Sequence, residues 1–321
     1  MPLKSDHDIL HPFIPQGGPT HHCDLPGVRI GVAEYVEGPT GCTVFCLDNR
    51  PLCAIYVRGS SALFIGRSGP TDIICLTGGS TYGLAAIAGT AQEFLVEHHY
   101  HTHWNDVARV AGAVIYDFRP RSNAVFPDVA LGRAAFRAAR STHFPLGAHG
   151  AGCSASVGKL FQGLSLLEPS GQGAASAIFQ HIPIAVYTVV NAVGAVFDHH
   201  GAVAHGFLDF HSHHHLSLTD QLARVTTGEE LHPPDGNTTL TVVFVGQRLE
   251  LYELDQLARQ VHSSLARAIQ PFHAAEDGDV LFAVSLPLVS NQRLPVSLLG
   301  AAVSEVAWHA VLACWPSAVA T

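Results

Sequence analysis

The pair Asn237–Thr238 offers the most distinctive chemistry in the sequence. A threonine hydroxyl is a weak nucleophile by itself, but cleavage of this peptide bond would give Thr238 a free α-amine. Such an amine titrates near about pH 8 and can accept the hydroxyl proton as an intramolecular base. The same hydroxyl can make the cut by attacking the Asn237 carbonyl, which forms an ester that water hydrolyses. One break in the chain therefore creates a nucleophile and its base together.

The residues that follow Thr238 leave a plainer interpretation open. In 238–245, threonines alternate with apolar residues, which is typical of a half-buried strand with no catalytic role. Whether Thr238 is a nucleophile therefore depends on the elements that position it.

Strands and helices alternate along the chain. The predicted strands are 28–35, 42–47, 52–57, 72–76, 110–116, 182–190, 193–197, 238–245 and 280–284. The predicted helices are 81–97, 130–140, 250–270 and 298–312. No regular βαβ cadence is present, so we predict an α/β (α+β layered) fold with sheets covered by helices on both faces. The segments 147–159 and 198–236 are expected to be loops, and the second ends directly before the Asn237–Thr238 bond, where long loops are usually functional.

Composition is that of a globular protein. The chain has 321 residues, of which 47% are hydrophobic and 13% charged, so it can bury a large core. The formal charge of −9 and the presence of only two lysines, Lys4 and Lys159, leave no basic cluster for nucleic acid. The first residues contain no apolar core of signal-peptide length, and no later run is long enough to span a membrane. We therefore expect a cytoplasmic protein with neither nucleic-acid nor membrane partners.

Cysteines and histidines form no known metal or redox motif. The seven cysteines are scattered without a C-x-x-C pair and are expected to be buried hydrophobic residues. Half of the 22 histidines lie in 98–103 and 199–215, but without H-E-x-x-H and without a carboxylate or cysteine at ligand spacing. The favoured interpretation is two solvated loops and no metal; metal binding is the alternative.

Two segments come close to other nucleophile motifs. Gly78-Gly79-Ser80-Thr81-Tyr82 fails the pattern G-x-S-x-G at its last position, so Ser80 is predicted to be a helix cap. Cys153 stands in a small-residue segment without a local signature of a cysteine hydrolase, which makes it a weak candidate.

Many short segments together match one family. They are Pro26-Gly27-Val28, Glu37-Gly38-Pro39-Thr40-Gly41, Ile74-Cys75-Leu76, Tyr82-Gly83-Leu84, Ala113-Val114-Ile115-Tyr116-Asp117-Phe118, Leu131-Gly132-Arg133-Ala134-Ala135, Ser154-Ala155-Ser156 with Gly158-Lys159, Gly236-Asn237-Thr238-Thr239, Gln260-Val261-His262-Ser263-Ser264, Ile269-Gln270-Pro271-Phe272-His273 and Asp277-Gly278-Asp279. On these segments the chain resembles the nylon-oligomer hydrolases (6-aminohexanoate-oligomer endohydrolases) within the L-aminopeptidase/D-esterase family. The resemblance covers nearly the whole chain after Leu25.

The resemblance implies a fold and a maturation. Members of the family resemble N-terminal-nucleophile hydrolases, whose precursor cuts itself into two chains that stay associated, and the fold is shared with acetyl-transferring relatives such as ornithine acetyltransferase. Applied to this sequence, residues 1–24 form an N-terminal arm, 25–237 the larger chain and 238–321 the smaller chain of one integrated domain.

The resemblance also implies the roles of several residues. Thr238 would be the nucleophile after self-cleavage at Asn237–Thr238, and the charge of Lys159 would keep the new amine neutral. Asn191 would donate to the oxyanion formed on the attacked carbonyl. The alternatives are a surface ammonium for Lys159 and a turn residue for Asn191.

Asp277, Asp279 and Tyr116 complete the expected site. The two carboxylates, two residues apart at a strand entrance, can orient the Thr238 amine and the Lys159 ammonium, although Asp-Gly-Asp is also ordinary turn chemistry. Tyr116 would help to bind the substrate or the oxyanion, with a core tyrosine as the alternative.

The predicted function is hydrolysis of linear amides, and the resemblance implies 6-aminohexanoate oligomers as substrates. The alternatives are an aminopeptidase acting on peptides or β-amino-acid amides, an acyltransferase of the same fold, and a histidine-rich metal-binding protein without activity. The resemblance further implies a homo-tetramer of processed protomers, and the proposed chemistry requires no cofactor. Ala192 replaces the proline that follows the equivalent asparagine in the most similar family members, so substrate entry is expected to differ.

Overall fold

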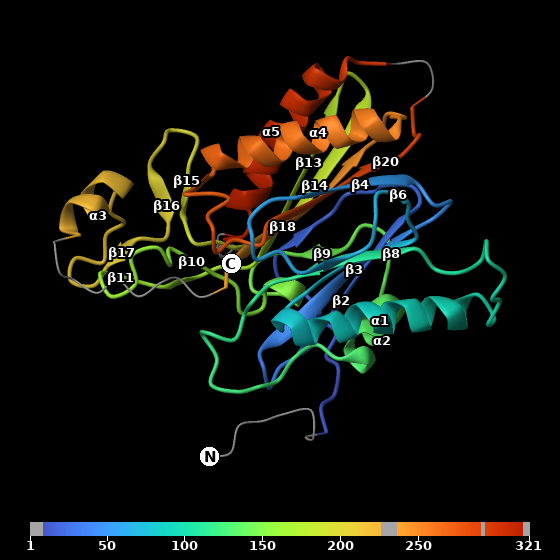
Figure 1. Cartoon of the computed structure of the whole chain (residues 1–321), viewed down its shortest axis with the longest axis horizontal. Helices are drawn as coiled ribbons and strands as arrows, with labels where there is room; N and C mark the ends of the chain where they lie inside the picture. Colours follow the sequence, from blue (N-terminus) through green and yellow to red (C-terminus); the bar gives the residue numbers. More distant parts are fainter. Residues whose placement is uncertain (1–8, 226–235, 290–292, 317–321) are drawn as a thin grey trace.

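Two facing β-sheets, each covered on its outer face by a pair of helices, form the body of the computed structural model (Figure 1). The structure describes residues 9–225, 236–289 and 293–316. The predicted arrangement of sheets between helices is confirmed.

The six-stranded sheet contains the strand that begins at Thr238. Its order is β13-β14-β18-β20-β4-β6. β18 runs antiparallel to β14 and parallel to β20, so it occupies the centre of the sheet. The strands are β13 (Gln172–Phe179), β14 (Ile182–Asn191), β18 (Thr238–Val245), β20 (Val280–Ser285), β4 (Leu52–Val57) and β6 (Gly69–Pro70).

The second large sheet has five strands in the order β2-β3-β7-β8-β5. Its strands are β2 (Val28–Tyr35), β3 (Thr40–Leu47), β7 (Ile73–Thr77), β8 (Val110–Val114) and β5 (Phe64–Ile65). Helices α1 (Ser80–Glu97) and α2 (Val129–Arg137) cover this sheet, whereas α4 (Leu251–Ser264) and α5 (Val296–Leu312) cover the six-stranded one (Figure 1).

The alternation along β18 explains how one strand serves two layers. Leu240, Val242 and Phe244 belong to the hydrophobic cluster between the two sheets, while Val243 and Val245 pack in the cluster under α4 and α5. Successive side chains of a strand point to opposite faces, so a strand buried on both faces needs an apolar residue at nearly every position.

The remaining elements are short. Several of them form a lobe beside the sandwich that also carries α3 (Leu218–Arg224) (Figure 1). These elements are β1 (Thr20–His21), β9 (Phe144–Pro145), η1 (Gly150–Gly152), β10 (Ser156–Val157), β11 (Ser165–Leu166), β12 (Glu168–Pro169), β15 (Ala195–Phe197), β16 (Val203–His205), β17 (Leu208–Asp209), η2 (Leu265–Arg267) and β19 (Ile269–Gln270).

Three local expectations were wrong. Segments 147–159 and 198–236 are not plain loops. The first contains η1 and β10, and the second contains β16, β17 and α3. Residues 226–235 lie outside the described part of the chain. The helix expected over 250–270 ends at Ser264. The prediction was too long because Leu265 and Ile269, from η2 and β19, enter the same core and continue the apolar spacing of the helix. Ser80 is the first residue of α1, and Gly79, at φ 79°, occupies the cap position instead.

Among the described residues, no helix combines the length and apolar character needed to cross a membrane.

Leu257 tests the packing of α4 on the six-stranded sheet. Its side chain is fully buried, so Leu257→Ala should lower the free energy of unfolding by about 2–5 kcal/mol through lost burial and a residual cavity. Tyr252 on the same helix is 73% exposed, and Tyr252→Ala should change that free energy by less than about 0.5 kcal/mol. Urea unfolding followed by circular dichroism measures both; equal losses would mean that α4 does not pack as described.

Candidate active site

Thr238 opens β18 at a position where three backbone segments meet. It pairs with Asn191, the last residue of β14, and its side chain is 5% exposed. The hydroxyl Oγ1 donates to the carbonyl oxygen of Asn237 over 2.5 Å, and the backbone N–H of Gly278 donates to the same oxygen over 2.7 Å. The carbonyl of the Asn237–Thr238 bond is therefore held between a hydroxyl and an amide donor.

Lys159 and Asn191 form the second part of the site. Lys159 is 2% exposed, and its Nζ donates to Asn191 Oδ1 at 2.7 Å and to Asn191 O at 3.1 Å. The Ser156 amide also donates to Asn191 Oδ1, at 3.1 Å. These donors fix the orientation of the side-chain amide, whose Nδ2 donates to the carbonyl of Tyr116 over 3.0 Å. The alternatives of a surface lysine and a turn asparagine are both wrong.

Asp277 and Asp279 reach the site from the entrance to β20. Asp277 forms an isolated parallel bridge with Asn237, and its Oδ2 accepts from the Ala274 amide at 2.8 Å. Asp279 Oδ1 accepts from the amide of Thr239 at 2.6 Å, directly after the candidate nucleophile. The Asp279 carboxylate thus fixes the backbone after Thr238, and the backbone of Asp277 pairs with the residue before it.

Burial changes the protonation of this pair. Desolvation and the neighbouring Asp279 charge raise the pKa of Asp277 to about 7, although the amides of Ala274 and Val193 and the charge of Lys159 act in the opposite direction. Desolvation also raises the pKa of Asp279, against the hydrogen bonds from His273 and Thr239. Two adjacent buried carboxyl groups therefore retain a proton at pH values where exposed aspartates have lost theirs.

His273 is a site residue that sequence reasoning missed. Its Nδ1 lies 2.9 Å from Asp279 Oδ2, so it holds the carboxylate that binds the Thr239 amide. The ring of His273 packs edge-on against the ring of His262, with the ring centroids 4.5 Å apart. Burial lowers the pKa of His262 well below its usual range, which keeps the His262 imidazole neutral. The only signal for His273 was its place in a family-like segment six residues before Asp279.

Tyr116 lies beside the bond between Asn237 and Thr238. It follows β8 by two residues, and the backbone of Gly236 packs so closely on it that an added Cβ would lie 2.7 Å from Tyr116 Cβ. The ring centroids of Tyr116 and Phe118 are 5.7 Å apart, and those of Phe118 and Tyr82 are 6.2 Å apart. Tyr82 is 63% exposed, so these rings form an aromatic path from the site to the surface.

The weak candidate Cys153 has no nucleophilic character in this fold. Burial, together with the nearby carboxylate of Glu34, raises the pKa of its thiol well above the usual range. A thiol that stays protonated is a poor nucleophile.

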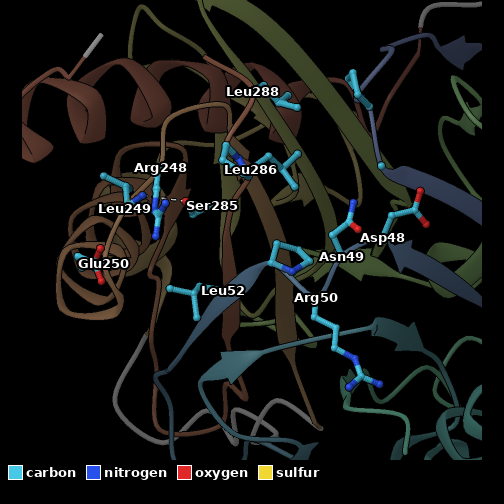
Figure 2. A pocket seen from close by; sticks show the side chains of 14 residues that line it. Asp48, Asn49, Arg50, Leu52, Arg248, Leu249, Glu250, Ser285, Leu286 and Leu288 are labelled. Atoms are coloured by element: carbon cyan, nitrogen blue, oxygen red, sulfur yellow. Dashed lines mark hydrogen bonds between the residues drawn. The ribbon is translucent and has the colours of Figure 1, made fainter. Parts of the chain in front are cut away.

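A separate cavity of about 500 Å³ lies at the other end of the central strands (Figure 2). Asp48, Asn49 and Arg50 line one side, and Arg248 and Ser285 belong to the other. Ser285 pairs with Val245 at the end of β18, whereas Thr238 begins that strand. This cavity therefore contains none of the expected site residues.

Solved structures with the same architecture identify the fold class. A β-aminopeptidase from Burkholderia sp. aligns with a TM-score of 0.64 at 15% identity, over 94% of this chain and 89% of that one. The L-aminopeptidase D-Ala-esterase/amidase of Ochrobactrum anthropi, described as a variant of the Ntn-hydrolase fold, aligns with a TM-score of 0.63 at 16% identity, over 94% and 88%. The chain therefore has the fold of an N-terminal-nucleophile hydrolase.

Sequence relatives narrow this class to a family. The profile of peptidase family S58 matches residues 21–321. The 6-aminohexanoate-oligomer endohydrolase of Kocuria sp. (strain KY2) is 40% identical over 324 residues, covering 94% of this chain and 88% of that protein. An enzyme of the same name from Agromyces sp. (strain KY5R) is 41% identical over 310 residues, covering 90% and 84%. The chain belongs to peptidase family S58 and is an amide hydrolase.

The raised pKa of Asp277 predicts a pH-dependent stability. The folded protein holds this proton more tightly than the unfolded chain, so the stabilisation is complete below about pH 4 and is lost as the pH rises through 7. The Thr238→Ala background keeps the peptide bond intact. In this background, the free energy of unfolding should fall by about 2–4 kcal/mol less between acid and neutral pH when Asp277 is also changed to Asn, because asparagine cannot ionise.

Urea unfolding of Thr238→Ala and Thr238→Ala/Asp277→Asn between pH 4.5 and 7.5 measures this difference. The other ionisable groups are the same in both chains, so their contributions cancel in the comparison. Parallel pH profiles would contradict the assignment of the proton to Asp277.

Proposed function

We propose that this chain is a self-processing amide hydrolase in which Thr238 first cuts the Asn237–Thr238 bond and then attacks the substrate. The mature enzyme would consist of 1–237 and 238–321. The observation that carries the proposal is the pair of donors on the Asn237 carbonyl oxygen, the Thr238 hydroxyl at 2.5 Å and the Gly278 amide at 2.7 Å.

This geometry supports self-cleavage. The Thr238 Oγ1 attacks the Asn237 carbonyl carbon through a five-membered ring, and the negative charge that develops on the oxygen is stabilised by the Gly278 N–H. The C–N bond then breaks, the nitrogen takes the hydroxyl proton, and an ester joins Asn237 to the Thr238 oxygen. Water hydrolyses this ester and leaves a carboxylate on Asn237 and a free amine on Thr238.

The raised pKa of Asp277 supports a role in moving the proton during this step. A carboxyl group that titrates near neutral pH can accept a proton and return it at the pH at which the enzyme works. Asp279 holds the Thr239 amide and thereby keeps Thr238 in place.

In turnover, the new amine of Thr238 acts as the base. It takes the hydroxyl proton as Oγ1 attacks the substrate carbonyl, and returns it to the leaving amine, so that an acyl ester forms on Thr238. The buried ammonium of Lys159 donates to Asn191, which is the strand partner of Thr238. A positive charge at this place lowers the pKa of the new amine and keeps the amine neutral.

Asn191 is assigned to the oxyanion of the substrate. Its Nδ2 carries two N–H groups, of which one donates to Tyr116 O. The other is available on the strand partner of Thr238, which supports donation to the attacked carbonyl. Tyr116 is assigned to substrate binding at the inner end of the aromatic path.

The substrate that best fits the relatives is a linear oligomer of 6-aminohexanoate. Two relatives at 40% and 41% identity carry the name 6-aminohexanoate-oligomer endohydrolase. The rings of Tyr116, Phe118 and Tyr82 provide an apolar path that suits the methylene segments of such an oligomer. The β-aminopeptidase fold of a structural neighbour supports release of N-terminal residues as the second candidate.

The assembly stays a prediction from the resemblance, and the location stays a prediction from the sequence. We propose a homo-tetramer of processed protomers in the cytoplasm. Light scattering on the processed protein would test the tetramer.

The first test of self-processing is intact mass spectrometry of the purified protein beside Thr238→Ala. The wild type should give fragments 1–237 and 238–321, and the variant should stay whole because it lacks the attacking hydroxyl. Thr238→Ser keeps a hydroxyl and should still be cut. An intact wild-type chain after long incubation, or a cut Thr238→Ala chain, would refute self-cleavage by Thr238.

Products formed from a 6-aminohexanoate tetramer separate the candidate activities. An endohydrolase should release dimer early, whereas an aminopeptidase should release monomer from the first turnover, as chromatography with mass detection can show. Lys159→Met should lower kcat about tenfold at pH 7, because a new amine that titrates near about pH 8 would then be mostly protonated. Unchanged turnover in a processed Lys159→Met enzyme would remove Lys159 from the mechanism.

A further inference from the structure

We propose that Glu168, His205 and His215 bind one divalent cation of borderline softness, and that Zn²⁺ is the ion the ligand set fits best. One ligand atom from each side chain lies within 4.8 Å of the other two. Two imidazoles and one carboxylate with an open position are a common zinc ligand set, and imidazole selects zinc over magnesium. None of the three belongs to the candidate active site.

The two imidazoles lie against the two oxygens of one carboxylate. His205 Nδ1 lies 2.5 Å from Glu168 Oε1, and His215 Nε2 lies 3.0 Å from Glu168 Oε2. Around a tetrahedral zinc ion with bonds of about 2.0–2.1 Å, neighbouring ligand atoms are about 3.3 Å apart. His205 Nδ1 and Glu168 Oε1 therefore need to separate by less than about 1 Å to admit the ion, with water as the fourth ligand.

The carboxylate of Glu168 is fixed by its surroundings. Glu168 pairs with Val157 of β10, and the amide of Gly206 donates to Glu168 Oε2 over 2.7 Å. The group is therefore an oriented ligand.

His205 is fixed from the opposite side. Its ring stacks on the indole of Trp315 at 4.0 Å with an interplanar angle of 6°. The indole Nε1 in turn donates to the carbonyl of Pro169, the neighbour of Glu168, over 2.8 Å. The ring and the carboxylate therefore share one rigid frame, which reduces the ordering cost of binding an ion.

His215 is placed by the turn between residues 208 and 215. Leu208 forms an isolated antiparallel bridge with His215, and the Asp209 amide donates to His214 O at 3.0 Å. The Asp209 carboxylate accepts from the Ser212 amide at 2.8 Å and from Arg224 Nη1 at 2.6 Å, which closes the turn. The three ligands thus come from two segments that are each ordered without the ion.

The site is open enough for an ion to enter. The exposed fractions of the side chains are 17% for Glu168, 26% for His205 and 29% for His215.

A bound cation would tie the β16–β17 region to β12. Gly158 packs against Gly206 and Phe207 so closely that an added Cβ would lie within 2.8 Å of both, and Gly158 precedes Lys159. The cation would therefore stiffen the segment that carries the active-site lysine.

Calorimetry on chelator-treated protein without a histidine tag tests the site. Titration with Zn²⁺ should show one equivalent bound per chain, and Mg²⁺ should give no saturable signal. His215→Ala and Glu168→Gln should each weaken Zn²⁺ binding at least about tenfold. Saturating Zn²⁺ should raise the Tm of the wild type by about 3 °C or more and leave the Tm of these variants unchanged.

His213→Ala and His214→Ala are the matched controls, because both side chains are exposed in the same segment and lie outside the cluster. They should bind Zn²⁺ as the wild type does. If Glu168→Gln fails to fold, His215→Ala decides alone, with circular dichroism in chelator as the check of folding. Absence of saturable binding by the wild type, or unchanged affinity in His215→Ala, overturns the proposal.

Discussion

The pairing of β14 with β18, which places Asn191 opposite Thr238, is the constraint on which the rest of the site depends. The register follows from alternating burial: Ala185, Tyr187 and Val189 fill the space between the sheets together with Leu240 and Val242. A slip by one residue would turn every one of these side chains to the other face. The apolar core of the sandwich therefore also aligns the polar groups at the end of its strands.

Those polar groups carry charge at a depth where charge is costly. Lys159, Asp277 and Asp279 are all nearly fully buried, and desolvation disfavours each ionised form. The structure offsets this differently for each: Lys159 donates to Asn191, Asp279 accepts from Thr239, and Asp277 retains a proton to about pH 7. Ionisation inside the site is thus set by burial and by the neighbouring groups.

Much of this arrangement could be predicted from the sequence, and the exceptions have physical reasons. The strands 28–35, 52–57 and 238–245 were predicted with correct bounds, because short runs rich in apolar and β-branched residues between turn residues mark strands. The end of α4 could not be predicted, since apolar residues continue past Ser264 into the same core. Lys159 was singled out because its segment matches the family and because lysine is rare in this chain.

Contacts that join distant segments had no local signal. His273 stood in a segment recognised only as family-like, and nothing in its neighbourhood showed that it would meet Asp279. Likewise, the histidines near position 205 lacked a carboxylate at ligand spacing, because Glu168 lies 37 residues before His205 and is brought there by the pairing of β10 with β12. Such contacts come from topology, which sequence spacing does not contain.

The order β14-β18-β20-β4 has a kinetic consequence. Both strands that follow position 237 in this sheet, β18 and β20, are inserted side by side between two strands that precede it. A break at this position would leave the order of the strands unchanged, yet it would turn refolding from a reaction of one chain into an encounter of two. A cut molecule would then unfold as a unit but reassemble at a rate that depends on concentration, so its lifetime would be governed by the barrier to unfolding.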